Sequence, residues 1–114
     1  MSFNPAKFLF GWLTPKRKER TRDDFPKGYE AQCARARNDA VRWYIARYGE
    51  APRIPAVKVT VEPRPRDGMG GWANNAHDVH IWSGQRPFMG SLEHEFRHTL
   101  AIYSGKGGSE LAVK

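Results

Sequence analysis

The chain has 114 residues, of which 39% are hydrophobic and 27% are charged, and this balance favours one small globular domain over a disordered chain. Its single cysteine, Cys33, excludes an internal disulfide and a zinc site built from several cysteines of one chain. The net charge of +7 lies mainly in residues 1–50 and suits a partner with an acidic surface.

Residues 1–27 have the pattern of an N-terminal arm that precedes a domain of residues 28–114. An apolar cluster is followed at once by a basic run at residues 16–22, and the cluster comprises Phe3, Phe8, Leu9, Phe10, Trp12 and Leu13. Aromatic side chains beside a basic run are typical of segments that bind an acidic surface, so residues 3–22 are predicted to contact nucleic acid, anionic lipid or a protein. The alternative is that the aromatic side chains pack back onto the domain and the basic run is a solvated linker.

Residues 28–82 contain one stretch with the spacing of a helix, followed by stretches with the alternation of strands. Residues 28–48 are predicted to form an amphipathic helix that ends at Gly49, because apolar residues recur at helical spacing: Cys33, Ala36, Ala40, Val41, Tyr44, Ile45 and Tyr48. Residues 56–62 and 77–82 alternate apolar and polar side chains, which predicts two strands, and a short strand is expected to start at Gly71. With a further helix after residue 87, the predicted fold class is α+β, with a small antiparallel or mixed sheet packed on two helices.

The residues that could carry out chemistry are concentrated in residues 91–105. A helix that covers this stretch is predicted to begin at Pro87 or Ser91 and to end at Ser104 and Gly105. This helix contains the sequence His94-Glu95-Phe96-Arg97-His98, which fits the pattern His-Glu-x-x-His. Because residues four apart lie on one face of a helix, His94 and His98 can bind one zinc ion. Glu95 then has the position of a general base that takes a proton from metal-bound water.

A catalytic zinc site needs a third protein ligand, and the sequence offers three candidates. Glu110 is favoured, because the glycine-rich segment 105–108 allows the chain to turn back and return a carboxylate to the metal. His77 and His80 are the alternatives, of which strand alternation lets only one face the zinc helix. Water or a second chain could also complete the ligand set.

These residues resemble the zincin metallopeptidase superfamily, and the chain is similar to the very small zincin-like proteins of bacteria and their phages. The resemblance implies a helix packed behind a small sheet whose edge strand binds an extended peptide beside the metal. It matches His94 and His98 to the zinc ligands, Glu95 to the general base and residues 77–82 to the edge or near-edge strand. Ala101 and Ser104 stand where the metzincin branch has a glycine and a third histidine, which excludes that branch.

The predicted function is therefore that of a zinc-dependent metallopeptidase that hydrolyses a peptide bond of a peptide or protein substrate. The alternative is a non-catalytic zincin-like structural or assembly protein, for example of a phage particle, whose basic arm binds a partner, nucleic acid or a membrane surface. The apolar run at residues 8–13 is too short to span a bilayer, and no small-residue cleavage site follows it. We therefore expect a cytoplasmic or virion-associated protein.

Overall fold

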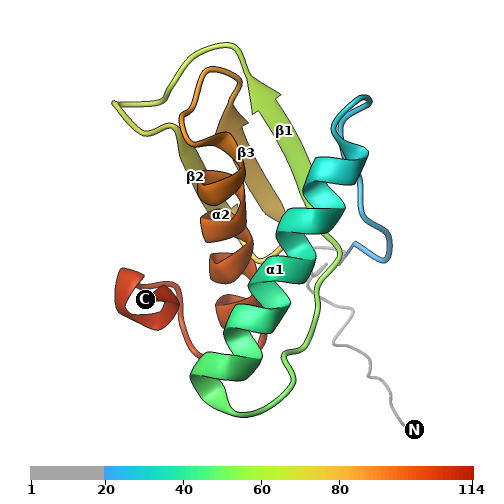
Figure 1. Cartoon of the computed structure of the whole chain (residues 1–114), viewed down its shortest axis with the longest axis vertical. Coiled ribbons are helices and arrows are strands. Elements are labelled where there is room, and N and C mark those ends of the chain that lie inside the picture. The colour runs from blue at the N-terminus through green and yellow to red at the C-terminus, as the bar shows by residue number, and fades with distance from the viewer. Residues whose placement is uncertain (1–19) are drawn as a thin grey trace, which may run out of the picture.

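The computed structural model describes residues 20–114, which form an α+β fold with two long helices on one face of a three-stranded sheet (Figure 1). In chain order the elements are α1 (Glu30–Tyr48), β1 (Lys58–Glu62), β2 (Gly71–Asn75), β3 (Asp78–Trp82), α2 (Phe88–Tyr103) and the short 3-10 helix η1 (Glu110–Val113). The predicted fold class, with a small mixed sheet packed on two helices, is confirmed. The expectations for the apolar cluster and for most of the basic run fall in residues 1–19, outside the described residues.

The sheet has the order β1-β3-β2, with β3 parallel to β1 and antiparallel to β2. The strand that the resemblance predicts at or next to the sheet edge, residues 77–82, is therefore the central strand. Its Val79 and Ile81 are fully buried, as expected for a strand covered by helices. The edge strand that lies against α2 is β2, and Trp72 on β2 is paired with His80 on β3.

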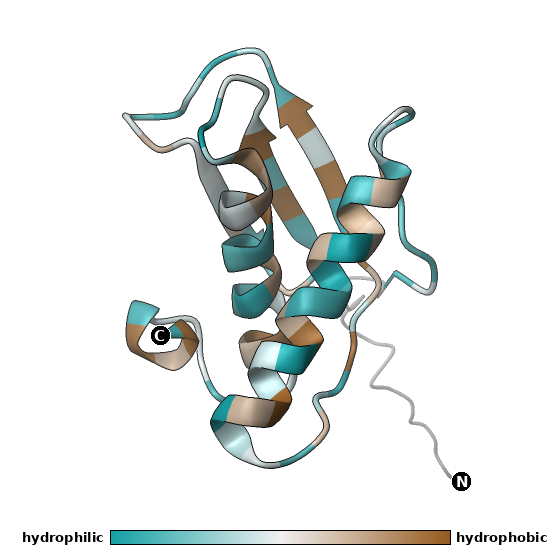
Figure 2. Ribbon diagram, viewed as in Figure 1, coloured by the Kyte–Doolittle hydropathy of each residue, from teal (hydrophilic) through white to brown (hydrophobic). Residues whose placement is uncertain are grey.

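The core lies between the two helices and the sheet. The side chains that α1 contributes are mostly small, whereas α2 and the sheet contribute larger ones, so α1 can approach α2 closely. The buried cluster comprises Cys33, Ala36, Ala40 and Tyr44 from α1, Leu92, Phe96 and Leu100 from α2, and Val57, Val59, Val79 and Ile81 from the sheet region. Figure 2 shows hydrophobic segments alternating with hydrophilic ones along the helices and the strands β1 and β3.

Two details of the predicted elements are corrected by the structure. Ile45 was expected in the buried stripe of α1 but is 46% exposed, because the buried face follows Cys33, Ala36, Ala40 and Tyr44 and Ile45 lies outside that row. The first strand begins at Lys58 rather than at residue 56. The backbone of Val57 is bonded instead to residues 23 and 24: its N–H donates to the Asp23 carboxylate (2.8 Å) and its carbonyl accepts from the Asp24 N–H (2.9 Å).

Residues 23–25, which the sequence assigns to the arm, contact the domain. The carboxylate of Asp23 also accepts a hydrogen bond from Arg37 on α1, at 2.7 Å. The ring of Phe25 meets that of Phe96 edge to face, with 6.1 Å between centroids. Among the elements of residues 20–114, no helix has the length and apolar character that would let it cross a membrane.

Candidate metal centre

The helix α2 presents the two histidines of the His-Glu-x-x-His pattern side by side. Leu92, Phe96 and Leu100 are buried in the core, and this fixes the rotation of α2 about its axis. His94 and His98 lie on the side of α2 away from these three residues, with ring centroids 5.0 Å apart. The side chain of His94 is 39% exposed and that of His98 only 9%, so this side of α2 is partly covered.

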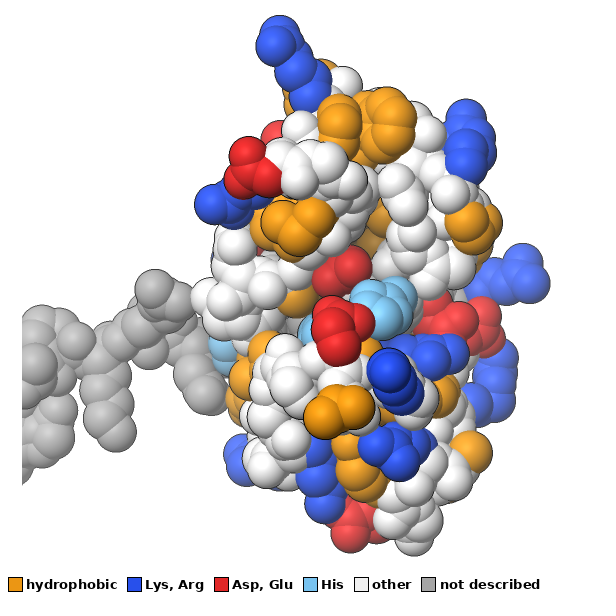
Figure 3. All heavy atoms as spheres, turned by 90° about the vertical axis from the view of Figure 1, so that its left-hand side faces the viewer, with side chains coloured by type: hydrophobic (Ala, Val, Ile, Leu, Met, Phe, Trp, Pro, Cys, Tyr) orange, Lys and Arg blue, Asp and Glu red, His pale blue; other side chains and the backbone are white. Residues whose placement is uncertain are grey.

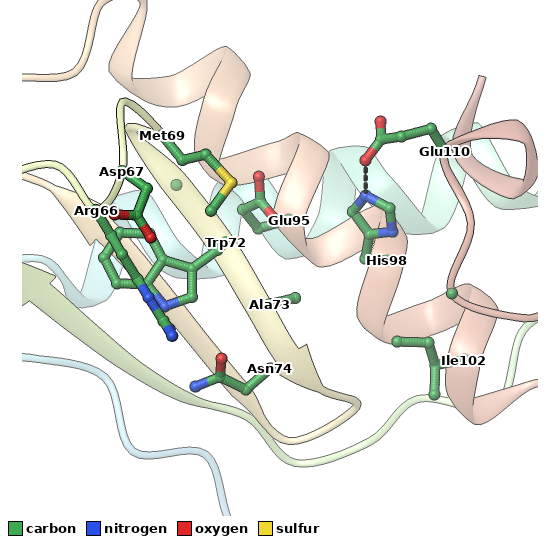
Figure 4. Close-up of a pocket in the computed structure, with 12 residues that line it drawn as sticks. Arg66, Asp67, Met69, Trp72, Ala73, Asn74, Glu95, His98, Ile102 and Glu110 are labelled. Carbon is green, nitrogen blue, oxygen red and sulfur yellow. Dashed lines mark hydrogen bonds and ion pairs between the residues drawn. The ribbon is translucent and has the colours of Figure 1, made fainter.

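The chain after α2 turns back and places Glu110 against both histidines. Gly105 and Gly107 adopt positive φ angles of 82° and 97°, which residues with a side chain adopt only with strain. The Glu110 carboxylate then lies 3.0 Å from Nε2 of His94 through Oε1 and 2.8 Å from Nε2 of His98 through Oε2. Figure 4 shows the carboxylate directed at the ring of His98, and Figure 3 shows histidine and acidic side chains together at the surface.

The donor set of His94, His98 and Glu110 could hold a metal ion. One ligand atom from each residue lies within 4.8 Å of the other two. Two imidazole nitrogens and one carboxylate oxygen are zinc donors, and three protein ligands leave a fourth position open. Within residues 20–114 this is the one group of three or more histidine, cysteine, aspartate or glutamate residues with donor atoms so close together.

The alternative ligands His77 and His80 lie elsewhere. Nδ1 of His77 is 2.7 Å from the carbonyl oxygen of Ala56, and its ring packs against that of Tyr103. The ring of His80 stacks on Trp72, its partner across the strand pair, with 5.1 Å between centroids. Strand alternation puts His80 on the sheet face opposite to buried Val79 and Ile81, so it points away from α2.

Two carboxylates hold His80 on that face of the sheet. Its Nδ1 lies 2.6 Å from Glu62 and its Nε2 lies 3.3 Å from Asp78. Burial raises the pKa of Asp78, but hydrogen bonds from Asn74 and His80 and the charge of His80 outweigh it and hold the pKa below its usual value. Both ring nitrogens of His80 are therefore already engaged, at a place separate from the His94 and His98 pair.

Glu95 is buried beside the candidate ligands and faces β2. It is only 7% exposed. A Cβ atom on Gly71 of β2 would lie 3.3 Å from Cγ and 3.4 Å from Oε2 of Glu95, so the missing side chain at Gly71 leaves the room that Glu95 occupies. Burial, and then the negative charge of Glu110, raise the pKa of Glu95 to about 7. A carboxyl group with this pKa can take up and release a proton at neutral pH, as a general base must.

Glu110 has the opposite electrostatic balance. Partial burial raises its pKa, but the hydrogen bond and charge of His98, together with those of His94, outweigh burial and keep the pKa below its usual value. Glu110 is therefore ionised at neutral pH, as a metal ligand requires. Its side chain is nevertheless 69% exposed, so its position depends on how the C-terminal segment is held.

A cleft of about 430 Å³ runs along β2 and reaches the candidate ligands. One wall is formed by Glu95, His98 and Ile102 of α2 together with Glu110, as Figure 4 shows. The rest is lined by β2 and by the segment that precedes it: Arg66, Asp67, Met69, Gly71, Trp72, Ala73 and Asn74, with Gly108 from the C-terminal turn. The sequence analysis did not place Gly71 or the segment before β2 in the candidate site. The glycine pair at residues 70–71 was the one feature of the sequence that could have indicated a close approach there.

No protein-family model matches the chain, and neither a curated protein nor a solved structure matches it. The resemblance to zincins therefore stays a prediction, and functional conclusions depend on the geometry of the site itself.

Proposed function

We propose that this protein is a zinc-dependent metallopeptidase. His94, His98 and Glu110 are the proposed zinc ligands, Glu95 is the proposed general base and the cleft along β2 is the proposed binding site for an extended peptide. The observation that carries the proposal is the position of the Glu110 carboxylate, within 3.0 Å of a ring nitrogen of both histidines. It supplies a third donor of a type that zinc accepts, and it comes from a segment outside the helical motif.

The second support is the environment of Glu95. A zinc ion held by these residues would supply Lewis-acid chemistry, which activates water and polarises a peptide carbonyl. Glu95 is the neighbouring group that receives a proton, and its pKa of about 7 lets it act at neutral pH. Its limited exposure and the close approach of Gly71 hold the carboxylate between α2 and β2, where the cleft passes.

The third support is the shape of the cleft. Among residues 20–114, β2 pairs with β3 alone, so within this part of the chain one edge of β2 carries unpaired backbone groups. An extended peptide can add to such an edge through main-chain hydrogen bonds, with its side chains in adjacent pockets. The edge of β2 and the proposed catalytic groups line the same cleft, which favours a peptide over a small molecule as substrate.

Zinc binding is tested first. Purified protein, dialysed against a trace of zinc, is expected to retain about one equivalent of the metal. Glu110→Gln and His98→Ala should each lower zinc affinity at least roughly tenfold, whereas His80→Ala should leave it unchanged, because His80 lies on the other sheet face. Less than about one-tenth of an equivalent in the wild type would overturn the proposal.

Hydrolysis is tested next with a mixture of fluorogenic peptides. Glu95→Gln should reduce the rate by about 100-fold or more and leave zinc content unchanged. Unchanged hydrolysis in this variant would rule out Glu95 as the base. A wild type that holds zinc but cleaves no peptide would favour the alternative of a non-catalytic structural or assembly protein. We further propose that the protein is cytoplasmic or virion-associated and that residues 3–22 bind a partner with an acidic surface.

A further inference from the structure

The segment that carries Glu110 is held by both helices. Three consecutive carbonyl oxygens of η1 accept hydrogen bonds from side chains: Leu111 from Arg47 at 3.0 Å, Ala112 from Tyr48 at 2.6 Å and Val113 from Arg97 at 3.3 Å. Arg47 and Tyr48 end α1, and Arg97 belongs to α2 between the two histidines. The donors from both helices therefore converge on the four residues that begin with Glu110.

The link between α2 and η1 is rich in glycine. It contains Gly105, Gly107 and Gly108, and glycines leave a backbone with wide conformational freedom. Beyond Glu110, in contrast, Ala112 and Val113 are buried in a small cluster with Ala101 and are packed against Trp43. The position of the Glu110 carboxylate is thus set from its C-terminal side, by the docking of η1.

Tyr48 is the central donor of this docking. Its hydroxyl makes the shortest of the three hydrogen bonds, to the middle carbonyl. Its ring is enclosed by Tyr44, with 4.7 Å between centroids, by Trp43, and by the cations of Arg47 and Lys106 on its face. The ring would stay in place without its hydroxyl, so the hydrogen bond can be removed alone.

We propose that Tyr48 is a positioning residue for the third metal ligand, which it holds toward His94 and His98 by anchoring η1 at Ala112. This inference rests on the proposed zinc site, and it extends that site to a residue that the His-Glu-x-x-His pattern does not include. Residues that orient metal ligands commonly change metal affinity 10–100-fold when they are mutated.

The chain offers a matched control. Tyr44 lies one turn earlier on α1 and is fully buried, and its hydroxyl has no hydrogen-bond partner among the described residues 20–114. Tyr48→Phe is expected to weaken zinc binding about tenfold in a competition assay with a chromophoric chelator, whereas Tyr44→Phe is expected to leave it within about twofold of the wild type. Circular dichroism confirms that both variants are folded.

A double mutant separates positioning from a general structural effect. If Tyr48 acts through Glu110, adding Tyr48→Phe to Glu110→Gln should cause no further loss of zinc affinity. An equal tenfold loss in both backgrounds would overturn the inference. Equal zinc affinity in the wild type and in Tyr48→Phe would also overturn it while leaving the proposed zinc site in place.

A readout without metal tests the anchor itself. The N–H of Ala112 in η1 donates to the carbonyl of Ser109, the residue that precedes η1, at 3.1 Å. In the metal-free protein, Tyr48→Phe should speed hydrogen exchange at Ala112 about tenfold, and Tyr44→Phe should not. Unchanged exchange would overturn the anchoring role whether or not zinc binds, and a wild type that binds no zinc would overturn the proposed site and the role of Tyr48 in it.

Discussion

Glu95→Gln should stabilise the metal-free protein at neutral and alkaline pH. Glu95 is 7% exposed and lies near the ionised Glu110, so the folded chain holds its negative charge in an unfavourable place. Glutamine keeps the shape of the side chain and carries no charge. The unfolded chain has no such burial, and the difference between the two states sets the size of the effect.

The size follows from the pKa of Glu95, which rises from an ordinary 4.5 to about 7 on folding. Because the folded-state pKa is raised, the stability that the protonated group contributes is fully present below pH 4.5 and is lost as the pH rises through 7. At about 1.4 kcal/mol per pH unit, the complete loss is about 3 kcal/mol. Between pH 5 and pH 8 about 2 to 3 kcal/mol of it should be lost.

Urea unfolding in the presence of a chelator measures this at both pH values. The variant's advantage over the wild type should grow by about 2 to 3 kcal/mol from pH 5 to pH 8. Glu50→Gln is the control, because the Glu50 side chain is 59% exposed and its change should stay within about 0.5 kcal/mol. A difference between variant and wild type that is the same at both pH values would refute the reasoning.

Three further predictions concern the site and the core. Gly71→Ala should lower peptide hydrolysis at least roughly tenfold and leave zinc content unchanged, because the new Cβ would lie 3.4 Å from the Glu95 carboxylate and displace it. Full activity of the variant would show that the Glu95 carboxylate tolerates this side chain. His98→Ala should abolish the zinc-dependent gain in melting temperature, whereas His80→Ala should retain it, and the opposite order would exclude the assigned ligand set. Cys33 should resist iodoacetamide in the native protein at pH 8 and react fully in urea, because burial and then the charge of Glu30 raise the pKa of its thiol to about 11. Mass spectrometry measures the alkylation, and rapid alkylation of the native protein would contradict this prediction.

Local patterns in the sequence were sufficient to predict the main elements and to name His94, His98 and Glu95, and the glycine-rich segment favoured Glu110 as the third candidate ligand. Helical periodicity in α1 and α2 and strand alternation in β1 and β3 are patterns of residues close together in the sequence. They can therefore be recognised without knowing the tertiary fold. The same holds for His94 and His98, since one helical turn brings them together in any helix. Ile45 shows the limit of such patterns, because which apolar residues of α1 are buried depends on where α2 packs.

The sequence favoured Glu110 over His77 and His80 as the third candidate ligand, but only the tertiary structure brings Glu110 against that pair. Glu110 and His80 both lie far from His98 along the chain, and only the turn at Gly105 and Gly107 and the docking of η1 bring Glu110 into contact. The order of the strands made β2 the edge beside the site, and so placed Gly71 against Glu95. The physical reason is that the pKa of Glu95 and the distance from Glu110 to the histidines depend on contacts between elements that are distant in sequence. The spacing of residues within one helix carries no information about such contacts.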